Sequence, residues 1–176
     1  LDFRVESNGN ANMIFVDGGS DHVNIGTSSD LGAVLNVNGS GYFTTADNTD
    51  TLELVSTDTD ASSGPNVRLY RNSASPADGD IIGQIDFEGR NDNSQDVVYG
   101  RIRSVASDVS DGTEDARLIF ETMIAGTISE TMRAIGTETV FNDGSADIDF
   151  RVESNGKTHA IFVDGGNDHV CINTSD

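Results

Sequence analysis

Two histidines of this chain, His22 and His169, occupy the same position of a sequence that occurs twice. Imidazole nitrogens are good ligands for transition metals, and a threefold axis through three copies of the chain could bring three such rings together. The alternative is a histidine at the surface or packed within the fold. We treat His22 and His169 as the metal candidates of the sequence, and we predict no metal and no cofactor for the chain.

A second pattern combines aspartate with glycine. Residues 17–21 read Asp-Gly-Gly-Ser-Asp and residues 164–168 read Asp-Gly-Gly-Asn-Asp. Calcium-binding glycine–aspartate motifs occur as tandem nonapeptides, whereas here the pattern returns only after 147 residues. Because Asp and Gly also favour turns for backbone reasons alone, we predict a tight turn at each place.

Carboxylates offer no distinctive catalytic pair. Glycan hydrolysis requires two carboxylates that face one groove, but the 30 Asp and Glu side chains are spread along the chain without a spacing that singles out two of them. Ser-His-Asp order, P-loop and dinucleotide fingerprints are absent, so we predict that the chain is not an enzyme. Arg4 with Glu6, and Arg151 with Glu153, are expected to form ion pairs between chains.

The elements that position these residues belong to a long internal repeat. Residues 2–29 return as residues 149–176 with 20 of 28 positions identical. Self-similarity at a constant offset is typical of arrays whose units bury surface against neighbours. We expect a shaft repeat at 1–30, a connector at 31–46, a β-rich middle at 47–142 and a second shaft repeat at 147–176.

The composition limits the function further. A net charge of −20 over 176 residues disfavours phosphate-rich partners, so we expect no nucleic acid. No apolar run approaches the 18 or so residues of a membrane span, and the single Cys171 cannot form an internal disulfide. Since the chain begins at Leu1 rather than Met, we expect a processed chain or a segment of a longer one.

Short β-branched and aromatic runs predict an all-β fold with antiparallel strands joined by Asn-Gly and Gly-Gly turns of positive φ. Ile128, Met132 and Ile135 have helical spacing, which leaves a short helix as the alternative to a strand there. The connector is expected to hold at most one short strand, and residues 56–65, 72–80 and 108–115 are expected to form loops. The strands are expected at 3–5, 13–16, 22–25, 51–56, 66–71, 81–88, 96–105, 117–124 and 138–141, with the repeat strands recurring after residue 147.

The residues Val23-Asn24-Ile25-Gly26-Thr27-Ser28-Ser29, followed by Leu35-Asn36-Val37-Asn38-Gly39, resemble a signature of tail-fibre and other virion appendage proteins of tailed bacteriophages, of the kind found in marine samples. Residues 69–73, 87–92 and 110–115 are similar to the sequence between such signatures. Two positions depart from the pattern: Asp30 stands where the family usually has Pro, and Asn173 replaces the signature glycine in the second repeat.

This resemblance implies an elongated, intertwined parallel homotrimer, located in the virion outside the cell. It also implies contacts with other tail proteins and the presentation of an element that recognises a host surface glycan or protein. Short strands with one apolar face fit trimerisation, because copies of the chain can bury what one chain cannot. Two alternatives remain open: an extracellular adhesin or surface filament of a bacterium, and a glycan-degrading tailspike.

Overall fold

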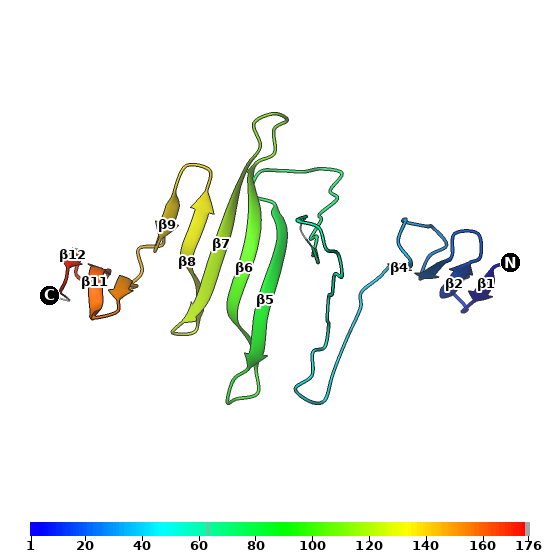
Figure 1. Ribbon diagram of the computed structural model, residues 1–176, viewed down its shortest axis with the longest axis horizontal. Coiled ribbons are helices and arrows are strands. Elements are labelled where there is room, and N and C mark those ends of the chain that lie inside the picture. The colour runs from blue at the N-terminus through cyan, green and yellow to red at the C-terminus, as the bar shows by residue number, and fades with distance from the viewer. Residues whose placement is uncertain (63, 175–176) are drawn as a thin grey trace. The chain divides into compact units, whose positions relative to one another are not determined.

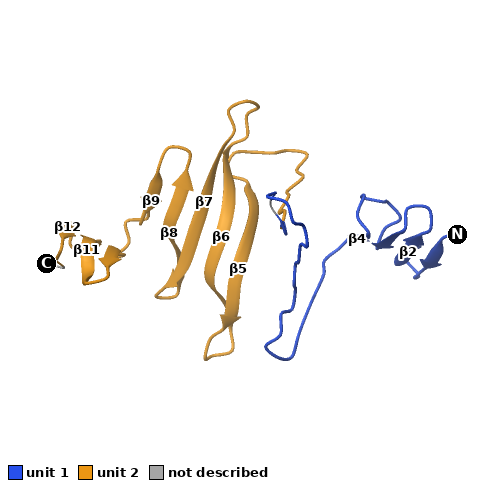
Figure 2. Cartoon of the chain, in the orientation of Figure 1, with its two compact units in different colours: residues 1–66 blue, residues 67–176 orange. Residues whose placement is uncertain are grey.

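The computed structural model describes residues 1–62 and 64–174. Ser63, in an expected loop, and Ser175 and Asp176, at the end of the second repeat, lie outside the described residues. The chain divides into two compact units, residues 1–66 and residues 67–176 (Figure 2).

In the described residues all regular structure is β, as the sequence predicts, and it forms three sheets (Figure 1). The first repeat forms a sheet in the order β1-β2-β3-β4, the second repeat forms β10-β11-β12, and the middle forms a five-stranded meander, β5 to β9. The strands are β1 Phe3–Val5, β2 Ile14–Asp17, β3 His22–Ile25, β4 Leu35–Val37, β5 Ile81–Arg90, β6 Asp96–Asp108, β7 Asp115–Ile124, β8 Thr127–Ile135, β9 Thr139–Phe141, β10 Phe150–Ser154, β11 Lys157–Asp164 and β12 His169–Ile172.

The strand preferred for residues 128–135 is confirmed, and the helix considered as its alternative is wrong. These residues belong to β8, which pairs with β7 along its length; Met132, for example, lies opposite Phe120. On its other side, Met132 lies opposite Phe141 of β9. Neighbours on both sides and the β-branched residues of the segment outweigh the helical spacing of its apolar residues.

The connector contains one short strand, β4, and its direction corrects the purely antiparallel prediction. β4 pairs with β3 in parallel, with Asn24 opposite Asn36. Residues 26–34 carry the chain back to the start of β3, so that β4 runs alongside it. Both asparagines are buried, and the Asn36 amide donates to Asn24 Oδ1 at 2.8 Å.

Two expected strands, 51–56 and 66–71, do not form. The structure assigns no strand to either segment, and Leu52, Val55 and Tyr70 are exposed. Their residues have the right composition, but a strand also needs a ladder partner, which a pattern within one segment does not supply. The expected loops at 72–80 and between β6 and β7 are present, as are the described residues of the loop 56–65.

The five-stranded sheet has two chemically different faces. A continuous row crosses all its strands through Ile85, Ile102, Phe120, Met132 and Phe141. We call the side that bears this row the apolar face. The neighbouring row on the other side, which we call the charged face, includes Asp86, Arg101, Glu121 and Glu130. Side chains alternate between faces along each strand, so adjacent rows point in opposite directions.

In the sequence, apolar or small residues alternate with polar or charged ones along both segments, which predicts one apolar side for each strand. The apolar or small positions are Gly83, Ile85 and Phe87 in β5, and Val98, Gly100 and Ile102 in β6. The structure largely confirms this prediction. Ile85 and Phe87 lie opposite Ile102 and Gly100, as expected for one apolar side. Val98 departs from it, because an irregularity in register between Phe87 and Glu88 places Val98 opposite Glu88. A bulge adds a residue to one strand and shifts the alternation beyond it.

The turns of the repeat do not use glycine as predicted. In the loop that follows Asp17, the residue with positive φ is Asp21, at 62°, rather than Gly18 or Gly19.

Gly18 is needed for another reason: a Cβ there would lie 2.5 Å from the carbonyl oxygen of Leu1. Gly165 of the second repeat has the same relation to Ile148, also at 2.5 Å. The glycine permits a close backbone approach rather than a left-handed turn.

Candidate functional site

The aspartate–glycine segments form tight turns, as predicted. The Asp17 carboxylate accepts hydrogen bonds from the amides of Gly19, at 2.8 Å, and Ser20, at 3.3 Å. The Gly19 amide is the main cause that lowers the pKa of Asp17. In the second repeat the side-chain amide of Asn167 does most to lower the pKa of Asp164. The two carboxylates therefore stabilise the turns in which they lie.

The turn is also tied to the start of its repeat. Asp2 Oδ1 accepts a hydrogen bond from the Gly18 amide at 3.1 Å, and Asp149 Oδ1 accepts one from the Gly165 amide at the same distance. Each aspartate precedes the first strand of its repeat. The identical Asp and Gly positions of the two copies thus make the same long-range contact.

The two metal-candidate histidines have different surroundings. His22 is half-buried, and its Nδ1 lies 2.9 Å from Asp30 Oδ1. The pKa of Asp30 is lowered mainly by the hydrogen bond from the Gly32 amide, and to a smaller extent by the hydrogen bond with the His22 ring. His169 is exposed at the start of β12. Among residues 1–62 and 64–174, no group of three or more His, Cys, Asp or Glu side chains is arranged to hold a metal ion.

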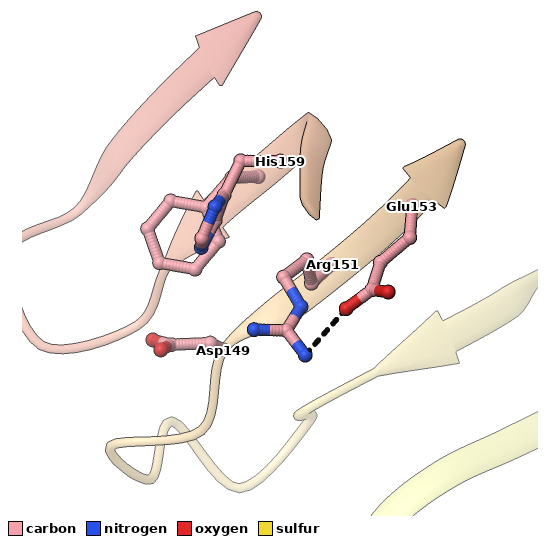
Figure 3. A pocket seen from close by; sticks show the side chains of 5 residues that line it. Asp149, Arg151, Glu153 and His159 are labelled. Carbon is pink, nitrogen blue, oxygen red and sulfur yellow. Dashed lines mark ion pairs between the residues drawn. The ribbon is translucent and has the colours of Figure 1, made fainter. Parts of the chain in front are cut away.

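An open depression of about 500 Å³ lies on the second repeat, and the sequence did not point to it (Figure 3). Its lining residues are Asp149, Arg151, Glu153, His159 and Phe162. The Arg151 guanidinium pairs with Glu153 at 2.7 Å, and the His159 ring meets the buried Phe162 ring edge-on with centroids 4.9 Å apart. His159 Nδ1 lies 3.0 Å from the Thr158 hydroxyl.

The depression has groups that could contact a polar ligand, but each of its polar side chains already contacts another group of the chain. The first repeat keeps Asp2, Arg4, Glu6 and Phe15 at the equivalent positions and replaces His159 by Asn12. Arg4 of β1 forms an ion pair with Glu6, the residue that follows this strand, and Arg151 forms one with Glu153 within β10. We expected these pairs between chains; the structure forms them within one chain, because residues two apart on a strand share a face.

The densest set of ionic contacts lies on the charged face of the five-stranded sheet. Arg101 donates to Asp86 Oδ1 at 2.5 Å, and this hydrogen bond is the main cause that raises the pKa of Arg101. Arg103 donates to Glu121 Oε1 at 2.8 Å. The Glu121 side chain is 7% exposed. An acidic residue of the central strand β7 is thereby held between arginines of its neighbour β6.

The same face carries two of the most buried apolar side chains of this sheet. Ile119 lies between Arg103 and Arg133 in register and is 3% exposed, as is Val105. Arg133 reaches Asp143 at 2.7 Å. Long arginine stems can cover apolar neighbours while their charged ends reach carboxylates or water. The alternation of Arg101 and Arg103 in the sequence indicated this face, but their partners on β5 and β7 required the register.

The described residues contain no helix long and apolar enough to cross a membrane. Comparison with protein-family models and with curated proteins finds no match for the chain.

Proposed function

We propose that this chain is a structural segment of a tail fibre or virion appendage of a tailed phage. In this proposal three copies assemble in parallel into a spacer that presents a host-recognition element, and the segment has no catalytic role. Its partners are further copies of itself and other virion tail proteins.

The observation that carries the proposal is the repeat of one small sheet before and after a larger one. β1-β2-β3 and β10-β11-β12 have the same antiparallel register: Phe15 lies opposite Arg4 and Asn24, and Phe162 opposite Arg151 and Cys171. Recurrence of a unit along the chain is typical of a shaft. The resemblance of residues 23–29 and 35–39 to the fibre signature supports the same function.

Exposed apolar side chains support the assembly of several copies. A single chain leaves Leu52, Val55, Val67 and Tyr70 each about two-thirds exposed in segments that do not pair as strands. A sheet with one apolar face also needs a second layer to cover that face. Association of identical chains supplies that cover.

The first test is the number of chains in a particle. Sedimentation equilibrium or mass photometry of the purified chain should give three copies, because the chain by itself leaves much apolar surface in water. Electron microscopy of the same particles should show rods. A folded monomer that persists at nanomolar and micromolar concentration alike would contradict the proposal.

Two alternatives have their own tests. A bacterial adhesin would carry a secretion signal or a cell-wall or membrane anchor in its flanking sequence, whereas a phage fibre would carry a segment that binds a baseplate. A glycan-degrading tailspike would shorten purified host polysaccharide. The depression beside Asp149, Glu153 and His159 is the place to mutate if such activity is found.

A further inference from the structure

The apolar face of the five-stranded sheet is a surface that the proposed function does not yet explain. Phe87 is 57% exposed, Ile85 is 49% exposed and Leu118 is 42% exposed. Leu69 comes close to Gly83 at one edge of the sheet, and the Phe150 ring lies 4.8 Å from the Phe141 ring at the other. These contacts leave Ile85, Phe87 and Leu118 exposed, while Ile102, Phe120 and Met132 in the middle of the row are half-buried.

The face is also free of charge. Its paired positions in the body of the sheet bear no Asp, Glu, Lys or Arg side chain: they are Gly83, Ile85, Phe87, Gly100, Ile102, Ser104, Leu118, Phe120, Thr122, Ile124, Thr127, Ser129, Met132, Ala134, Thr139 and Phe141. The charged face of the same strands bears Asp86, Arg101, Glu121 and Arg133. A sheet with one apolar face needs a second layer to cover it.

The area left in water is large enough to require a partner of substantial size. The chain exposes 13228 Å², whereas a folded monomer of 18.6 kDa is expected to expose about 8,200 Å². The excess, on the order of 5,000 Å², belongs to the whole chain, and the apolar face is one part of it. An excess of this size is in the range that obligate protein assemblies bury.

The distribution of charge on the chain favours this face as the place where its copies meet. With a net charge of −20, two copies repel one another over most of their surface, and an uncharged face is where they can come together. Anionic membranes are repelled over the whole surface. A face of large aliphatic and aromatic side chains is also complementary to itself, as a symmetric interface requires.

We propose that the apolar face of the five-stranded sheet, centred on Ile85, Phe87, Ile102 and Phe120, is the surface by which copies of this chain pack together around their common axis. The inference rests on the proposed trimer and adds to it the surface that forms it. The charged face then points outward, where its ion pairs remain at the boundary with water.

The test compares two variants of β5 that add the same charge to opposite faces. Phe87→Glu places a carboxylate in the interface, and sedimentation should show at least a tenfold weaker association. Gln84→Glu, on the charged face opposite Arg103, should associate as the parent does. Circular dichroism of both variants checks that the sheet remains folded, which we expect because Phe87 is exposed in the single chain.

A labelling experiment gives an answer even if Phe87→Glu fails to fold. In a Cys171→Ser background, the thiol of Phe87→Cys should react with maleimide at least tenfold more slowly in the native assembly than in urea. Gln84→Cys in the same background should react readily in both. Rapid native labelling at position 87, or full association of a folded Phe87→Glu, would overturn the inference.

The outcomes separate this inference from the trimer itself. A trimer whose position 87 is freely labelled refutes the interface and leaves the proposed assembly standing. A dimer protected at position 87 supports the interface and refutes the threefold symmetry. A stable monomer overturns both.

Discussion

Glu121 illustrates how much a single residue depends on its neighbours. The side chain is nearly buried on the central strand of an acidic chain, where an isolated carboxylate would be costly. Arg103 donates to it at 2.8 Å, and Arg101 lies 3.8 Å from its second oxygen. Two of the few basic residues of the chain are thus used to neutralise one acid.

Replacing this residue should therefore be destabilising. Glu121→Ala leaves two arginines without their shared acceptor, and we expect a loss of about 1–3 kcal/mol in the free energy of unfolding. Urea titration followed by circular dichroism measures it. Glu88→Ala is the matched control, since Glu88 is exposed on the edge strand β5 and should change stability by less than about 0.5 kcal/mol. Equal effects of the two variants would show that the Glu121 contacts contribute nothing specific.

At the scale of elements, the repeat sheet depends on the contact between its turn and the residue before its first strand. The Gly18 amide donates to Asp2, and the backbone of Leu1 lies where a Gly18 side chain would go. The second repeat makes both contacts through Gly165, Asp149 and Ile148. This close approach makes glycine necessary at one position of the turn in each copy.

Adding a methyl group at this position should disrupt the repeat sheet. Gly18→Ala puts a Cβ into the Leu1 backbone, and such overpacking typically costs about 1–3 kcal/mol. Hydrogen exchange of the β2 and β3 amides should report faster local opening. Gly9→Ala serves as the control, because nothing lies within 4 Å of a Cβ built there. Unchanged exchange in Gly18→Ala would mean that the turn can move away from Leu1 at no cost.

The elements differ in how far the sequence predicted them. The strands β5 to β7 were predicted because their residues alternate and are β-branched or aromatic, and local patterns of that kind carry through to the sheet. Residues 51–56 have a similar composition but remain unpaired. The parallel pairing of β4 with β3 was also missed. Pairing and direction depend on segments distant in sequence, which composition does not identify.

On the scale of the whole molecule, charge and apolar surface act against each other. The net charge of −20 drives copies of the chain apart, while its exposed aliphatic and aromatic side chains favour association. Because Arg4 and Arg151 are paired with Glu6 and Glu153 of the same chain, they do not need acidic partners from a neighbouring chain. Raising the ionic strength should therefore weaken the repulsion between copies and shift the equilibrium toward association.

We expect salt to strengthen the assembly. The screening length falls from about 10 Å at 0.1 M ionic strength to about 3 Å at 1 M, so repulsion between acidic copies should fade. Sedimentation between 0.05 and 1 M NaCl should show tighter association at the higher concentration. A variant with several exposed aspartates changed to asparagine is the control and should respond less. Dissociation by salt would instead indicate that ion pairs between chains hold the assembly together.

The sequence by itself determined the all-β class, the turns at the repeated aspartates, and the separation of apolar from charged side chains on β5 and β6. These properties follow from residue type and from spacing within a few positions. Only the tertiary structure decided that Asp86, Arg101 and Glu121 share one row, that Gly18 accommodates Leu1, and that Ile102 lies in an apolar row spanning five strands. Each of these depends on strand register or on contact between distant segments, which no local spacing encodes.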